Sequence, residues 1–101
     1  MAHLINVENK TATVLIDKDF NFKTHKSFTN SVKESLEQGA KIIVLEFKEV
    51  EYMDSTALGL LMVAKDNAEG VDCEIKLQNV TGYARKIIEM SQFDKKFEIL
   101  G

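Results

Sequence analysis

Hydrophobic and polar residues alternate in two short segments near the start of the chain, residues 3–7 and 11–16. Alternation with a period of two is typical of half-buried strands, and residues 8–10 between the segments have the composition of a turn. The two segments are therefore predicted to form a β-hairpin. Residues 17–23 follow no clear period and are predicted to form a loop.

The spacing of apolar residues changes after this loop. Apolar residues then recur every four positions, which is the period of an amphipathic helix. Thr24 can cap the start of this helix, and Gly39 is suited to end it. The apolar positions of its buried face are Phe28, Val32 and Leu36.

The middle of the chain is denser in aliphatic residues. Residues 41–47, KIIVLEF, contain four consecutive aliphatic residues, a pattern typical of a strand buried on both faces. Residues 55–68 are rich in leucine, methionine and alanine and predict a second helix. Residues 72–77 alternate again and predict a strand.

Residues 81–91 predict a third helix, and residues 97–100 are expected to add an edge strand. The order is ββαβαβαβ, which indicates a small mixed α/β sheet with crossover helices packed on its faces. In such sheets, ligand-facing chemistry gathers beyond the carboxyl ends of the strands. One apolar stripe of the third helix is expected to hold Val80, Tyr83, Ala84, Ile87, Ile88 and Ser91.

Composition narrows the class of protein. The 101 residues are 45% hydrophobic and 29% charged and contain no proline, which favours a single domain over residues 1–101. The longest apolar run, residues 57–64, is far shorter than the roughly 20 residues of a spanning helix, so no membrane insertion is expected. A net charge of −3 and lysines that are scattered along the chain argue against a nucleic-acid partner. The lone Cys73 favours the reducing cytoplasm.

The candidate chemistry lies in YMDSTALGLL, residues 52–61, where Asp54, Ser55 and Thr56 stand directly before a strongly apolar helix. Such residues are the preferred N-caps of ordinary helices, so capping alone is one interpretation. One side chain suffices for a cap, however, and at least one of the three is left to project outward. A helix N-terminus also favours a phosphate, because it offers free N–H groups and the positive end of the helix dipole.

These segments resemble the stand-alone STAS-domain proteins, the anti-sigma-factor antagonists of bacteria. The resemblance includes IIVLEF, YMDSTALGLL and the late segment VTGYARKIIEMSQFDKKFEIL, and so spans nearly the whole chain. It implies a STAS-like fold in which a partner serine kinase phosphorylates Ser55. Asp54 matches the aspartate of the family motif, and Thr56 is the neighbouring hydroxyl.

The resemblance also implies the function. The unphosphorylated protein would bind a serine kinase that acts as an anti-sigma factor, phosphorylation of Ser55 would release it, and a serine phosphatase would restore binding. Three positions depart from many antagonists: Ala57 stands at a usual glycine, and Lys18 and Asn21 stand at a glycine and an aspartate of the earlier loop. An alternative is a STAS regulatory subunit of a membrane transport system.

A partner surface is expected where residues 19–23, residues 48–54 and the exposed side of the Ser55 helix meet at one end of the sheet. Phe20 and Phe22 have two interpretations, since they can fold over the first helix or anchor a docking surface. The residues expected to bind the partner are Asn21, Phe22, Tyr52, Asp54, Ser55 and Ala57.

No constellation for catalysis, a metal or a cofactor can be assembled, so the protein is not expected to be an enzyme. His3 and His25 are expected at the surface, and Cys73 is expected to be a small buried hydrophobe. The methionines Met53, Met62 and Met90 are expected to fill gaps in the core.

Overall fold

The computed structural model describes residues 2–100 and begins with the predicted hairpin. Strand β1 (His3–Glu8) pairs with β2 (Thr11–Leu15) in an antiparallel register, with an irregularity between Leu4 and Asn6. The tight turn between them holds Asn9 and Lys10 at positive φ, 52° and 64°. Asparagine adopts this conformation more readily than most residues, which favours the turn at this position.

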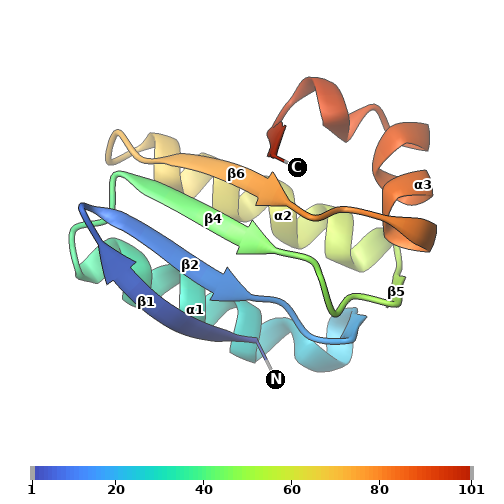
Figure 1. The fold of residues 1–101 in the computed structure, drawn as a ribbon, viewed down its shortest axis with the longest axis horizontal. Coiled ribbons are helices and arrows are strands. Elements are labelled where there is room, and N and C mark those ends of the chain that lie inside the picture. The colour runs from blue at the N-terminus through green and yellow to red at the C-terminus, as the bar shows by residue number, and fades with distance from the viewer. Residues whose placement is uncertain (1, 101) are drawn as a thin grey trace.

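The hairpin continues into a five-stranded sheet of order β1-β2-β4-β6-β7. Strands β4 (Ile42–Glu46), β6 (Glu74–Gln78) and β7 (Glu98–Leu100) join β2 one after another, and all of these pairings are parallel. Figure 1 shows the strands crossing the molecule in this order. The predicted fold class, a mixed α/β sheet with the order ββαβαβαβ, is confirmed.

Helices α1 (His25–Glu37) and α2 (Ser55–Glu69) connect the parallel strands and lie together behind the sheet in Figure 1. The sheet grows in one direction, so successive right-handed crossovers place their helices on the same face. The predicted burial of both faces of the central strand is confirmed, because residues 43–46 are all buried, although the two helices cover only one of these faces. Val44 on the open face is still only 8% exposed, because its register neighbours Thr13 and Lys76 flank it.

The core fills the space between the sheet and the two helices. Alternate residues of the three inner strands point into it and are almost fully buried, which is the reason these segments alternate in sequence. Phe28 and Val32 of α1 are buried as predicted, and Leu36 packs partly against the core. The inward strand residues are Ala12, Val14, Ile43, Leu45, Ile75 and Leu77.

Helix α3 (Gly82–Met90) lies beyond the carboxyl ends of the strands, away from α1. Of its nine residues only Ala84 and Ile88 are buried. With Val80, which precedes the helix, they make up the buried half of the predicted stripe, and the other half is at least partly exposed. Met90 is 73% exposed, and the expectation that it fills the core is wrong, because it lies two positions after the buried Ile88 and so points away from the buried face of the helix. Met53 is fully buried and Met62 is half-buried.

Two strands of two residues each, β3 (Asp19–Phe20) and β5 (Tyr52–Met53), form a separate parallel pair within segments predicted to be loops. A 3₁₀ turn, η1 (Phe22–Thr24), follows β3, and a second one, η2 (Phe93–Lys95), precedes β7. Segments of two or three residues are too short to show a periodic pattern of apolar residues, so the sequence does not reveal them. Within residues 2–100, no helix combines the length and apolar character needed to cross a bilayer.

Candidate functional site

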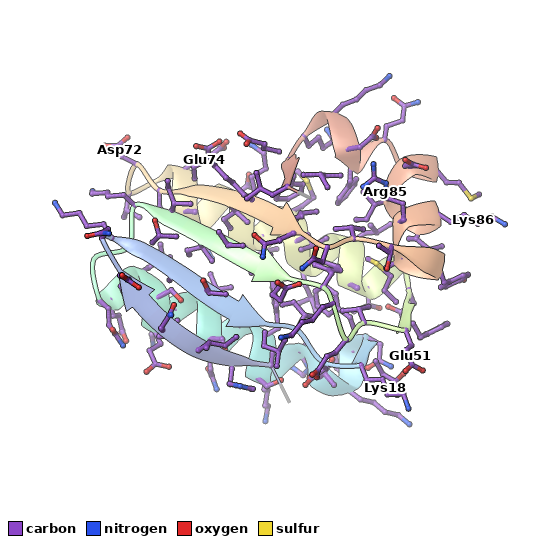
Figure 2. All side chains as sticks on the ribbon, viewed as in Figure 1. Lys18, Glu51, Asp72, Glu74, Arg85 and Lys86 are labelled. Atoms are coloured by element: carbon purple, nitrogen blue, oxygen red, sulfur yellow. The ribbon has the colours of Figure 1, made fainter. Side chains whose placement is uncertain are left out.

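The pairing of β3 with β5 brings the two expected partner-binding loops together at one end of the molecule. The carbonyl of Lys18 accepts hydrogen bonds from the backbone N–H groups of Glu51 (2.8 Å) and Tyr52 (3.2 Å). The Lys18 ammonium also lies 3.7 Å from the Glu51 carboxylate, and Figure 2 shows the two side chains next to each other. Backbone bonds therefore fix the relative position of the loops, while the exposed ion pair contributes little.

Asp54 caps helix α2. Its backbone is extended (φ −127°, ψ −173°), and its Oδ1 accepts a hydrogen bond from the N–H of Ala57 at 3.1 Å. This is the N-cap geometry in which one side chain satisfies a free N–H of the first turn. The cap belongs to Asp54, so neither Ser55 nor Thr56 is needed for it.

Ser55 is the first residue of α2 and is exposed. Among residues 2–100 its hydroxyl has no hydrogen-bond partner, so it is available to a reagent from outside. Thr56 is half-buried, and Ala57 is fully buried with its methyl group in the core. Of the two adjacent hydroxyls, Ser55 is therefore the more accessible.

The loop after β3 presents Phe22. Asn21 caps the 3₁₀ turn, with its Oδ1 accepting from the N–H of Lys23 at 3.0 Å, and its own N–H donates to Thr24 Oγ1 at 3.2 Å. Thr24 occupies the N-cap position of α1 but makes no side-chain cap bond there, so the predicted capping by Thr24 is wrong. The Thr24 hydroxyl donates instead to the carbonyl of Asp19 at 3.0 Å.

The two phenylalanines of this loop differ in burial, so only one of them folds over the first helix. Phe20 is fully buried, 4.9 Å from the Phe28 ring and 6.0 Å from the Phe47 ring, measured between centroids. Phe22 is 64% exposed and stacks on the half-buried His25 ring at 4.5 Å. Of the two rings, only that of Phe22 is exposed to solvent.

Tyr83 of α3 joins the site without having been predicted. Its ring lies parallel to that of Tyr52, with centroids 5.7 Å apart and planes 7° apart. Tyr52 is 45% exposed and Tyr83 is 48% exposed. One signal could have found it: a helix that follows a parallel strand begins at the carboxyl edge of the sheet, where Tyr52 also lies.

Glu46, the last residue of β4, is the second residue of the site that the sequence did not predict. It is 6% exposed and accepts hydrogen bonds from the side-chain amides of Gln78 (2.9 Å) and Asn79 (3.0 and 3.1 Å). The N–H of Lys48 donates to its Oε2 at 2.9 Å. A buried carboxylate satisfied by several donors ties the end of β6 to the start of the loop that leads to Ser55.

The other candidate residues do not form a reactive site. In the described part of the chain, no three histidine, cysteine or carboxylate side chains are grouped so that they could hold a metal ion. Cys73 is buried as predicted, and burial raises the pKa of its thiol, with a smaller opposing effect of Lys41. A raised pKa leaves less of the reactive thiolate. His3 is exposed as expected.

Comparison with known proteins identifies the family. The model of the STAS domain matches residues 4–100, so the chain belongs to the STAS domain family. A STAS-domain containing protein of Pseudomonas aeruginosa is 30% identical over 96 residues, which cover 95% of this chain and 94% of that protein.

Solved structures with the same fold include two kinds of protein. An anti-sigma factor antagonist from Mycobacterium paratuberculosis has a TM-score of 0.84 at 14% identity, covering 99% of this chain and 84% of its own. Unphosphorylated SpoIIAA, an anti-sigma factor antagonist, has a TM-score of 0.81 at 20% identity, and the match covers 98% of this chain and 87% of SpoIIAA. A structure of the phosphorylated form of Bacillus SpoIIAA is also known. A sulfate transporter family protein from Wolinella succinogenes has a TM-score of 0.80 at 15% identity, and the match covers 94% of this chain and 80% of that protein's chain.

Proposed function

We propose that residues 1–101 act as a single STAS domain that antagonises an anti-sigma factor in the cytoplasm, without catalytic activity of its own. The observation that carries the proposal is Ser55, an exposed hydroxyl without a hydrogen-bond partner among residues 2–100, at the start of a helix capped by its neighbour Asp54. Solved SpoIIAA, which shares the fold, exists in unphosphorylated and phosphorylated forms. Phosphorylation of Ser55 by a partner serine kinase would then control binding, and a serine phosphatase would reverse it.

The fold is suited to tolerate a phosphate on Ser55. The group would remain in water, near the N-terminus of a 15-residue helix whose dipole favours negative charge. The Asp54 cap already satisfies the N–H of Ala57, so the phosphate replaces no existing bond. No rearrangement of the backbone is required, and the switch acts on binding alone.

A partner that covers this surface would not tolerate the phosphate as well. Residues 34–54 contain six acids and two lysines, a balance of 2 − 6 = −4. Glu46 is held by amides and Glu51 faces Lys18, which leaves Asp54 and Glu49 as the nearest other acids in sequence. A phosphate adds a charge of about −1.5 to −2. Burying it beside these carboxylates costs several kcal/mol, or about a hundredfold in affinity.

Phosphorylation in vitro tests the acceptor. The cognate kinase with ATP is expected to add about 80 Da to the parent protein and to a Thr56→Ala variant, and nothing to a Ser55→Ala variant. Intact-mass analysis of protein isolated from its native host checks the same modification in the cell. If Ser55→Ala is modified as well as the parent, or if Thr56→Ala alone prevents modification, Ser55 is not the acceptor.

A regulatory subunit of a membrane transport system is the second candidate. The sulfate transporter family protein from Wolinella succinogenes has the same fold, which is the observation in its favour. Co-purification separates the two functions: a kinase that elutes with the protein supports the antagonist, and a membrane transport complex supports the transporter subunit. The exposed serine at the capped helix start favours the antagonist, because a phosphorylation switch uses it directly.

A further inference from the structure

A groove between α1 and α2 lies outside the Ser55 site. The two helices run side by side behind the sheet (Figure 1) and contact each other directly. The groove has a volume of about 240 Å³ and an almost entirely apolar lining. Its floor and walls include Phe28, Val32 and Leu36 of α1 and Leu60 and Val63 of α2.

One cation stands at this groove. Lys33 lines it, is exposed, and makes no ion pair with any residue from 2 to 100. None of the nine lining residues is acidic, and the polar members besides Lys33 are the neutral Thr29 and Asn67. A lysine stem can cover apolar surface while its ammonium stays in water, so the charge is available at the rim.

The size of the groove limits what can occupy it. A specific protein interface takes about 20–30 residues from each partner, far more than the nine residues that line this groove. The volume corresponds to about eight groups of the size of a water molecule, each about 30 Å³, and a methylene is of similar size. A short, unbranched hydrocarbon chain fits these dimensions.

From the apolar lining, the volume and the single unpaired cation, we infer that this groove binds a medium-chain carboxylate of roughly eight to ten carbons. The hydrocarbon chain lies between α1 and α2, and its carboxylate faces the Lys33 ammonium. This binding site is separate from the phosphorylation switch and does not rest on the proposed function.

Titration of the ¹⁵N-labelled full chain with decanoate tests the inference. Saturable shifts confined to α1 and α2, with a dissociation constant of about 1 mM or tighter, are expected. Octanoate should bind more weakly, by about fourfold for each methylene removed. Decyltrimethylammonium has the same chain and the opposite charge, so it should bind more weakly than decanoate.

Two pairs of variants locate the ligand. Val63→Trp should fill the groove and abolish binding, whereas Val71→Trp places the same ring on a similarly exposed valine that does not line the groove and should bind normally. Lys33→Ala should weaken decanoate binding by up to about fivefold, and Lys26→Ala, an exposed lysine of α1 outside the groove, should not.

The inference is overturned by any of three results: no saturable shifts up to 10 mM decanoate, taken as about ten times the expected constant, equal binding to the Val63→Trp and parent proteins, or binding of the cationic probe as tight as that of decanoate. The unchanged spectrum of each free variant serves as the check that it is folded. Phosphorylation of Ser55 is measured separately, so failure of either proposal leaves the other intact.

Discussion

Two chain segments lead into helices side by side at the same end of the molecule, and they differ in what they present. Strand β3 ends on the buried Phe20, which is followed by the extended cap Asn21 and the exposed Phe22. Strand β5 ends on the buried Met53, which is followed by the extended cap Asp54 and the exposed Ser55. The first segment passes through a 3₁₀ turn before α1, whereas the second leads directly into α2. The same local arrangement thus exposes an apolar ring in one segment and a hydroxyl group in the other.

Capping and exposure are divided between adjacent residues in these two segments. In each segment the side chain of an asparagine or aspartate accepts a hydrogen bond from a backbone N–H group of the following turn. The side chain of the next residue is therefore not needed for capping. The residue before the cap is buried and anchors the segment in the core. Substitutions at successive positions should therefore have sharply different effects.

The largest effect is expected from the buried ring. Phe20→Ala should lower the free energy of unfolding by about 3–5 kcal/mol, because it leaves a cavity beside Phe28 and Phe47. Phe22→Ala should change it by no more than about 0.5 kcal/mol and should instead weaken partner binding. Urea denaturation and a binding assay on the folded variants measure the two effects. A stability loss above 2 kcal/mol for Phe22→Ala, well beyond the roughly 0.5 kcal/mol of a surface change, would assign that ring to the core.

A negative charge at Ser55 should have the next largest effect. Ser55→Asp should weaken binding of the anti-sigma factor by about a hundredfold, because it brings like charges together in the interface, while Ser55→Ala should bind as the parent does. Asn30→Asp, on the exposed side of α1, adds the same charge elsewhere and should have no effect. Isothermal titration calorimetry with the purified partner measures the affinity of each variant. Equal affinities of Ser55→Asp and Ser55→Ala would rule out the electrostatic switch.

Loss of a cap should cost less. Asp54→Ala should lower stability by about 1 kcal/mol and slow phosphorylation of Ser55, because the first turn of α2 loses its bond to the N–H of Ala57. Asn21→Ala should cost about 0.5 kcal/mol, since it caps a single turn that Thr24 also holds. Asp54→Asn keeps the cap and serves as the control. A stability unchanged in Asp54→Ala would show that the cap does not stabilise α2.

The smallest effect concerns the backbone. Phosphorylation should shift amide resonances at residues 48–60, and to a lesser degree at residues 18–21, because the carbonyl of Lys18 is bonded to the Glu51 and Tyr52 N–H groups. The strands of the five-stranded sheet should keep their shifts. A ¹H–¹⁵N spectrum of each form checks this, and widespread changes would indicate an allosteric switch in place of a local one.

The elements of the fold could be predicted from the sequence because their apolar periods are long enough to detect. All three helices and all five strands of the main sheet appear where the sequence pattern indicated them, within two residues at most ends. The face on which α2 packs required the strand order, which no local pattern contains. Gly39 ends the first helix as expected, at φ +83°.

The site could be predicted only in part. Asp54 and Ser55 lie next to each other in sequence, so their motif was visible before the structure. The pairing of β3 with β5, the stack of Tyr52 on Tyr83 and the bonds of Asn79 to Glu46 join residues that are at least 31 positions apart. The predicted topology places Tyr52 and Tyr83 at the same edge of the sheet, but the contacts themselves leave no mark on a single sequence, because each residue alone also suits an ordinary surface or turn.

The order of the sheet has a consequence for how the chain can fold as it leaves the ribosome. Each new strand of the main sheet pairs with the strand synthesised before it, so no late segment has to insert between two early ones. Both short strands and the whole of α2 lie within residues 2–69. The segment that carries Ser55 can therefore assemble while β6, α3 and β7 are still being made, and the last third of the chain completes an edge of the sheet whose centre is already in place.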